Sequence, residues 1–210
     1  MAEFLRRHPE AAGGHFDYLR EPDGGDWSRA ALDAFARATG RETVSSENVI
    51  NGGADEEAFR RWRAEDLTGF LASLRAAAKA ANPACTVSAA VYPLAGKGGG
   101  AIAQDWRRWI EEGLLDEAVP MNYTEETGEL AAWLAGEPLG TGKIVSGLAW
   151  SAAGVHPSPE EILSQMRRAR AAGAEGCVLF SLTESLDKRL FPFLEEVERL
   201  WKAGGKEERE

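Results

Sequence analysis

Five short apolar segments, separated by longer stretches with helical periodicity, constrain the fold of this chain more than any other feature. They are residues 14–19, 86–92, 118–123, 143–150 and 176–182. Largely apolar strands that alternate with helices are typical of parallel sheets covered by helices. The sequence therefore predicts an α/β fold built from βα units.

Two of the intervening helices are marked clearly by the sequence. Residues 55–81 carry an apolar stripe at helical spacing, which Asn82-Pro83 ends. Residues 159–172 begin with Ser158 as the N-cap, and Glu161 completes a capping box. Further helices are expected over residues 29–38, 103–112 and 191–202. The first of these lies within a long insertion over residues 21–53. In the last one, Phe193, Leu194, Val197 and Trp201 are expected to be buried.

Composition limits the partners of the chain. It has 210 residues, enough for one sizeable core, and a formal net charge of −10. This charge disfavours broad binding to nucleic acids or anionic membranes, and no apolar run approaches the roughly 20 residues of a membrane span. We expect one domain over residues 1–203 and a charged tail over 204–210, with no signal peptide at the N-terminus.

No pattern in the sequence predicts a cofactor or a metal ion. Cys85 and Cys177 lie beside apolar strands and are expected to be buried free thiols. A phosphate-binding loop at residues 140–143 is rejected, because Ile144 replaces the necessary hydroxyl and a strand follows instead of a helix. The three histidines, His8, His15 and His156, do not have the spacing of metal ligands.

Polar and aromatic residues gather where the expected strands end. In a parallel barrel, the functional site lies at the carboxyl ends of the strands. Carboxylates, amides and aromatic rings suit a sugar, since rings stack on the apolar face of a pyranose and polar groups bond its hydroxyls. The candidate substrate-binding residues are His15, Tyr18, Arg20, Tyr92, Asp105, Asn122, Tyr123 and Trp150.

Asp17 is the sharpest candidate for catalysis. It lies within an apolar strand, and a period of two residues places it on the same side as His15. Two carboxyl groups can divide the acid and the nucleophile or base work on a glycosidic bond. The alternative is a structural Asp17 paired with Arg20, because a buried carboxylate needs a partner.

The partner carboxylate has two candidates at other strand ends. Glu184 follows the fifth strand, and Asp105 opens the helix that contains Trp106. Each has a structural alternative, because Glu184 can cap the final helix and Asp105 can lie in a first helical turn. Among the tryptophans, Trp150 is the expected sugar platform, and helix packing is the interpretation of Trp62, Trp109, Trp133 and Trp201.

Five motifs in a fixed order resemble those of a known family. They are Gly14-His15-Phe16-Asp17-Tyr18-Leu19-Arg20, Ser88-Ala89-Ala90-Val91-Tyr92-Pro93, Gln104-Asp105-Trp106, Pro120-Met121-Asn122-Tyr123, and Gly173-Ala174-Glu175-Gly176 through Phe180. Together they resemble the bacterial glycosyl-hydrolase-like family 10, over about residues 4–200. The resemblance implies a TIM-barrel glycosidase with Asp17 at the catalytic position of the fourth strand, in a family with many secreted or envelope proteins.

Two departures from the family pattern carry expectations of their own. Glu21 stands where the family usually has a tyrosine, and an acidic group there is expected to change a sugar subsite. The motif around Asp17 should lie on the fourth of eight strands, but it begins almost at the N-terminus. We therefore expect a partial (β/α)8 TIM barrel, about strands 4 to 8, that an N-terminal segment or a second copy completes. The inner side chains expected to face the gap are those of Val87, Ala89 and Val91.

The sequence thus predicts hydrolysis of glycosidic bonds in a polysaccharide or cell-wall glycan. A second hypothesis is a non-catalytic carbohydrate-binding remnant or an inactive truncated glycosidase, which keeps the aromatic and polar lining of the site but lacks the second carboxylate or the missing strands. A metal-dependent barrel hydrolase is disfavoured by the lack of clustered ligands. The distance between Asp17 and a second carboxylate at the strand ends discriminates between the first two hypotheses.

Overall fold

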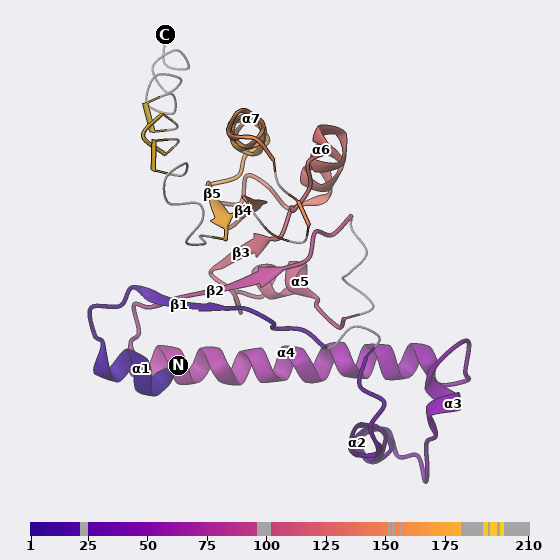
Figure 1. Ribbon diagram of the computed structural model, residues 1–210. Coiled ribbons are helices and arrows are strands. Elements are labelled where there is room, and N and C mark those ends of the chain that lie inside the picture. The colour runs from indigo at the N-terminus through magenta and orange to yellow at the C-terminus, as the bar shows by residue number, and fades with distance from the viewer. Residues whose placement is uncertain are drawn as a thin grey trace.

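The computed structural model describes residues 1–21, 25–95, 102–150, 152, 154–155, 157–181, 191–192, 194–196 and 198–199. Within them, strands and helices alternate along the chain (Figure 1). The strands are β1 (Gly13–Phe16), β2 (Thr86–Val91), β3 (Glu117–Pro120), β4 (Val145–Ala149) and β5 (Gly176–Phe180). The helices are α1 (Ala2–Arg7), α2 (Arg29–Thr39), α3 (Ser46–Val49), α4 (Glu56–Ala81), α5 (Trp106–Glu111), α6 (Thr127–Gly136) and α7 (Pro159–Ala171).

The strands are parallel and follow one another in sequence order, as the α/β prediction requires. β1 pairs with β2, β2 with β3, and β4 with β5. Two parallel bridges, Ala118 to Ile144 and Met121 to Gly147, join β3 to β4. Gly147 permits this close approach, because a Cβ atom there would lie 2.7 Å from the Pro120 carbonyl oxygen. Each of the five predicted strand segments therefore overlaps with a strand of one parallel arrangement, although β1 and β3 each begin one residue earlier and end three residues earlier than predicted.

The two faces of the sheet differ in what covers them. Val87, Ala89 and Val91 are almost fully buried, in one cluster with side chains of α4 and α5. The expectation that these three face a gap is wrong: alternation places them on one face, and that face is the one the helices cover. The opposite face looks into a cleft, where Val178 and Phe180 of β5 remain 44% and 48% exposed.

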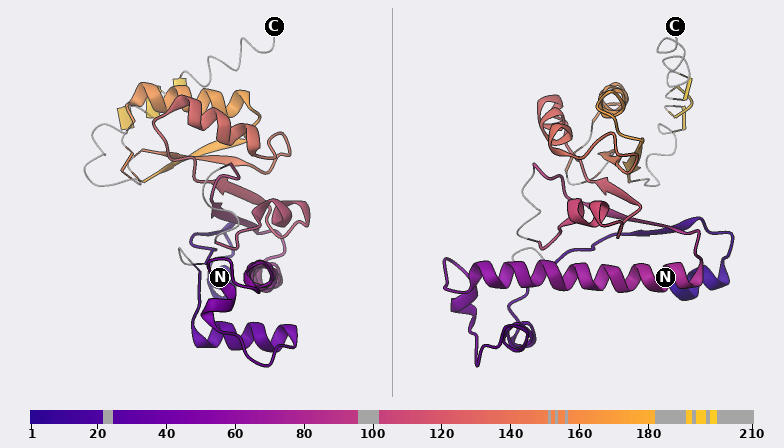
Figure 2. Two further views of the ribbon diagram at one scale, coloured as in Figure 1. Left: turned by 90° about the vertical axis from the view of Figure 1, so that its right-hand side faces the viewer. Right: turned by 180° about the vertical axis from the view of Figure 1, so that it is seen from behind.

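The helices cover the sheet in two groups. Helix α4 runs along β1 and β2, whereas α6 and α7 lie beside β4 and β5 (Figures 1 and 2). Leu130 of α6, Leu148 of β4 and Ala169 of α7 belong to one buried cluster. The predicted capping box of α7 is present, with Ser158 N–H donating to Glu161 Oε2 at 2.7 Å and Glu161 N–H donating to Ser158 Oγ at 3.3 Å.

The insertion between β1 and α4 has a small core of its own. It contains the predicted helix, α2, and the additional short helix α3, which lie at the opposite end of α4 from α1 (Figure 1). Phe35 of α2 packs edge-on against Phe59 of α4, with ring centroids 5.1 Å apart. Arg41 Nε and Nη2 both donate to Asp55 Oδ1, at 2.9 and 2.6 Å, which ties the loop after α2 to the start of α4.

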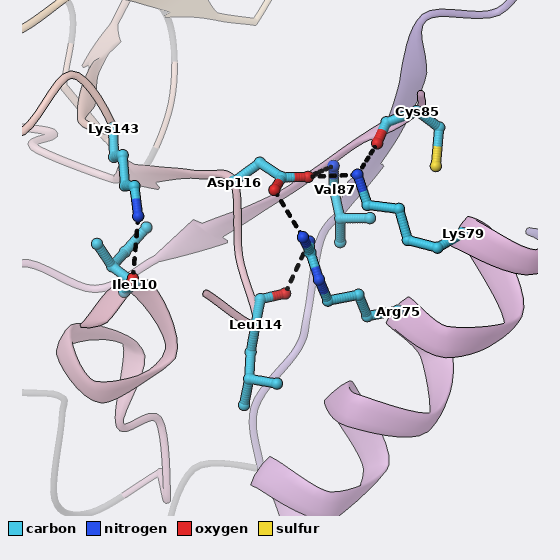
Figure 3. A network of polar contacts seen from close by, with 8 residues as sticks. All are labelled: Arg75, Lys79, Cys85, Val87, Ile110, Leu114, Asp116 and Lys143. Carbon is cyan, nitrogen blue, oxygen red and sulfur yellow. Dashed lines mark hydrogen bonds and ion pairs between the residues drawn. The ribbon is translucent and has the colours of Figure 1, made fainter. Parts of the chain in front are cut away.

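A polar network holds the amino ends of β2 and β3 to α4 (Figure 3). Asp116, just before β3, accepts hydrogen bonds at 2.8 Å from Arg75 Nη2 and from the Val87 N–H, and Lys79 Nζ lies 3.3 Å away. Burial by itself raises the pKa of Asp116. The hydrogen bonds from Arg75, Val87 and Lys79, together with the positive charge of Arg75, have a larger opposite effect and lower the pKa to about 2. This network is structural, since it lies at the end of the strands remote from the cleft.

Other expectations have mixed outcomes. The described residues between 191 and 199 are helical, but Leu194 is exposed at 37% rather than buried, while Phe193, Val197, Trp201 and the tail over 204–210 lie outside the described residues. Both cysteines are free, with Cys85 buried and Cys177 only partly buried. In the described part of the chain, no helix is both long and apolar enough to span a membrane.

Candidate active site

A cleft of about 1080 Å³ opens at the carboxyl ends of the strands. This is where βα proteins carry their functional groups, because loops after each strand converge there. Six of the residues singled out from the sequence line it: Asp17, His15, Tyr18, Arg20, Tyr92 and Tyr123. The further lining residues are Ala90, Pro93, Ala95, Val119, Met121, Glu129, Trp133, Ala152, Val178 and Phe180.

Asp17 follows the last residue of β1 at a sharp turn of the chain. Tyr18 has a φ of 55°, in the left-handed region that non-glycine residues seldom adopt. Its N–H donates to Asp17 Oδ1 at 2.7 Å. Tyr123 lies near enough for its phenol to respond to Asp17: burial, and then the negative charge of Asp17, raise the pKa of Tyr123 to about 12. The carboxylate is thus exposed to the cleft and faces a neutral phenol.

His15 is held by the neighbouring strand. Its Nδ1 lies 3.0 Å from Ser88 Oγ, and the two residues are directly paired across β1 and β2. The residue as a whole is exposed, but partial burial of its ring lowers the pKa of His15. The negative charges of Asp17 and Glu117 raise this pKa, but by less than burial lowers it. His15 therefore binds a proton less readily than a fully solvated histidine does.

Arg20 is stacked between two tyrosine rings of the cleft. Its guanidinium carbon lies 4.7 Å from the Tyr18 ring centroid and 5.0 Å from that of Tyr92, and its Nη1 donates to Tyr92 Oη at 3.0 Å. Glu21, the neighbour of Arg20, was expected to change a sugar subsite. It does not line the cleft and instead forms an ion pair with buried Arg63 of α4, at 3.0 Å.

The Gln104-Asp105-Trp106 motif supports the cleft from behind. Gln104 is buried; its Nε2 donates to the Leu19 carbonyl at 3.0 Å, and its Oε1 accepts the Tyr92 N–H at 2.7 Å. Trp106 Nε1 donates to the Tyr92 carbonyl at 2.8 Å. Asp105 occupies the N-cap position of α5 with an exposed side chain and does not line the cleft. This position favours the structural interpretation of Asp105, as a residue at the start of a helix.

Two further candidates, Trp150 and Asn122, are not brought to the cleft. Trp150 is only 6% exposed and belongs to a buried cluster with Ile162 of α7. Asn122 is fully buried, and its Nδ2 donates to Ser146 Oγ at 3.0 Å, on the helix-covered side of the sheet. Glu184 lies outside the residues that the structure describes.

A buried carboxyl lies beside Asn122. Glu137, at the end of α6, is 7% exposed and lies close to the Asn122 side chain; among the described residues, neither of its oxygens meets the full distance and angle criteria of a hydrogen bond. Burial raises the pKa of Glu137 to about 7, and Asn122 opposes this shift. The hollow that Glu137 lines lies between α6 and α7 and also contains Arg168.

Sequence reasoning missed two residues of the cleft. Glu129 and Trp133 lie four positions apart on α6, so they share one face of the helix, and both line the cleft. Trp133 was assigned to helix packing, and Glu129 was not considered. Their i, i+4 spacing on a helix that follows a strand end is a signal that could have identified them. Among the described residues, no group of three or more His, Cys, Asp or Glu side chains could hold a metal ion.

The cleft thus combines a carboxyl group with aromatic rings at the carboxyl ends of parallel βα units, where barrel enzymes carry their functional groups. The family model described as glycosyl hydrolase-like 10 matches residues 14–138, more than half of the chain. The chain therefore belongs to the glycosyl hydrolase-like 10 family, as its motifs predicted.

Two solved structures share the fold at low sequence identity. One is the PgaB (BpsB) glycoside hydrolase domain from Bordetella bronchiseptica, at 16% identity and a TM-score of 0.65, covering 86% of this chain and 55% of that one. The other is bee venom hyaluronidase in complex with a hyaluronic acid tetramer, at 13% identity and a TM-score of 0.54, covering 84% of this chain and 64% of that one. The chain thus spans little more than half of the first of these domains. No curated protein sequence matches it.

Proposed function

We propose that this chain forms the carboxylate-bearing part of a glycoside hydrolase barrel and cleaves glycosidic bonds in a polysaccharide or cell-wall glycan. The observation that carries the proposal is the position of Asp17, exposed at the carboxyl end of β1 within a cleft lined by Tyr18, Tyr92 and Tyr123. Membership of a glycosyl hydrolase-like family and a fold shared with two glycan-processing structures support it.

In this proposal Asp17 is the nucleophile, or the base that activates water. The Tyr18 N–H donates a hydrogen bond to Asp17 Oδ1 and so restricts the orientation of the carboxyl group, which both roles require. His15 and Tyr123 lie beside it as hydrogen-bonding groups for a sugar hydroxyl, and Arg20 fixes the rings of Tyr18 and Tyr92. Glu184 remains a candidate for the partner acid, whereas Asp105 is a poor one because it lies outside the cleft lining.

The finer fold assignment is part of the same proposal. We assign β1 to β5 to strands 4 to 8 of an eight-stranded barrel. Five parallel strands in sequence order with intervening helices support this assignment, as does the exposed face of β5. An N-terminal segment or a second copy of the chain would then pair with the outer edges of β1 and β5, whose partners in the described residues lie on one side only.

The experiment is a hydrolysis assay of the full-length protein on a panel of oligosaccharides and aryl glycosides. Asp17→Asn should lower kcat at least about 1,000-fold with an unchanged melting temperature, because the amide keeps the size of the side chain but cannot act as nucleophile or base. Asp33→Asn, on the exposed surface of α2, is the matched control and should retain wild-type activity. Wild-type turnover by Asp17→Asn would contradict the assignment.

A second candidate is carbohydrate binding without hydrolysis. It is favoured by the position of Asp105, one of the two candidate partner acids, outside the cleft. Under this alternative the wild-type protein binds oligosaccharides, measured by calorimetry, but releases no reducing ends from any of them.

A further inference from the structure

One face of α6 forms a wall of the cleft. The residues on this face belong to none of the family motifs, and the proposed function gives them no role. Glu129 and Trp133 lie one helical turn apart and line the same cleft as Asp17, which is contributed by β1. The carboxylate of one and the ring of the other are thus presented side by side. A sugar ring binds well to such a pair, since its apolar face stacks on the indole while its hydroxyls donate to the carboxylate.

The Glu129 carboxylate is held in place by its surroundings. Thr124, which is only 4% exposed, donates its Oγ1 hydroxyl to Glu129 Oε2 at 2.6 Å. The Thr124 carbonyl in turn accepts a hydrogen bond of 2.7 Å from Nε2 of buried Gln165 on α7. Glu129 is exposed, but one of its oxygens is therefore fixed through Thr124 to a second helix, which reduces the conformational entropy lost when a ligand binds.

Further rings continue this wall toward Asp17. Tyr123 and Phe180 are stacked with an interplanar angle of 5° and centroids 5.9 Å apart, and both line the cleft. The cleft volume of about 1080 Å³ exceeds the range of roughly 300–1,000 Å³ that holds a drug-sized ligand. There is therefore room for several sugar units rather than one.

We propose that Glu129 and Trp133 form a separate sugar subsite, which binds a unit of the glycan away from the bond that is cleaved. The proposal rests on the function proposed above in taking the ligand to be a glycan. Trp133 stacks on the pyranose, and Glu129 accepts hydrogen bonds from its hydroxyls. Because Glu129 is anionic, the subsite takes a sugar without a carboxylate and disfavours a uronic acid.

The test compares binding with turnover in the full-length protein. The probes are uncharged cello- and chito-oligosaccharides of two to six units and a hyaluronan hexasaccharide, titrated by calorimetry. Trp133→Ala should weaken binding of the uncharged hexasaccharide about tenfold, with a smaller effect on the disaccharide. Where the probe is hydrolysed, Trp133→Ala and Glu129→Gln should raise KM and leave kcat nearly unchanged. The controls are Phe70→Ala, an exposed ring on α4, and Glu160→Gln, an exposed carboxylate on α7.

The outcomes separate this subsite from the proposed hydrolysis. If the wild-type protein binds but never cleaves, and Trp133→Ala still weakens binding, the hydrolase proposal fails and the subsite stands. Unchanged hexasaccharide binding by Trp133→Ala, or no binding of any probe by the wild type, overturns the subsite. A fall in kcat of about 1,000-fold in Glu129→Gln without a change in KM also overturns it, since Glu129 would then take part in bond cleavage.

Discussion

Asp116 and Asp17 lie at opposite ends of the same parallel strands, and their surroundings differ in kind. Asp116 accepts hydrogen bonds from Arg75 and the Val87 N–H and has Lys79 beside it (Figure 3). Asp17 has the Tyr18 N–H as its donor and otherwise faces a cleft of rings. The amino end of the sheet uses its carboxylate to hold elements together, and the carboxyl end leaves one available to a ligand.

This difference predicts a large stability effect at one end only. Asp116→Ala should lower the free energy of unfolding by about 2–3 kcal/mol, because it leaves the Val87 N–H and the Arg75 guanidinium without their acceptor. Asp17→Ala should change it by less than about 0.5 kcal/mol. Urea unfolding of both variants measures the contrast, and equal losses would remove the distinction between the two ends.

The Asp116 carboxylate also makes the stability of the fold depend on pH in the acid range. The folded-state pKa of Asp116, about 2, lies below its ordinary value of 3.8. The associated stabilisation is therefore present above pH 3.8 and is lost as the pH falls through about 2. In unfolding measured between pH 5 and 2, the wild-type curve should fall more steeply than that of Asp116→Ala.

Glu137 extends the comparison to a third carboxyl group, which is buried beside Asn122. Its folded-state pKa of about 7 exceeds the ordinary 4.5, so its contribution is fully present below pH 4.5 and is lost as the pH rises through about 7. Glu137→Gln should therefore stabilise the fold at pH 8, by about 1–3 kcal/mol, and have little effect at pH 4.

Thermal unfolding at the two pH values tests Glu137→Gln. Glu42→Gln, at an exposed position of the loop after α2, is the control and should change stability at neither pH. A destabilised Glu137→Gln at pH 8 would show that the ionised carboxylate has a favourable partner, for which Arg168 in the same hollow is the candidate.

The smallest expected effect is on self-association, and it is tested by comparing substitutions of two exposed phenylalanines. Phe180 lies on the uncovered face of the sheet at 48% exposure, and Phe70 lies on α4 at 55%. If the uncovered face associates with a second copy, Phe180→Ser should weaken self-association about tenfold, and Phe70→Ser should leave it unchanged. Light scattering over a concentration series measures both. Equal association by the two variants would place the contact elsewhere.

Local patterns in the sequence were enough to predict the main elements. Five apolar segments predicted five strands, and the Ser158-Pro159-Glu161 pattern predicted the start of α7, because capping and periodicity depend on neighbours along the chain. The same alternation placed His15 and Asp17 together, and both line the cleft. The family also followed from motifs in order.

Only the tertiary structure decided which side of each element meets the cleft. Alternation shows that Val87, Ala89 and Val91 share a face, but the position of α4 and α5 determines that this face is the covered one. For the same reason Asn122 and Trp150, polar and aromatic residues at strand ends, point into helix packing. Glu129 and Trp133 reach the cleft because α6 packs beside β4, a contact between segments that no local pattern contains.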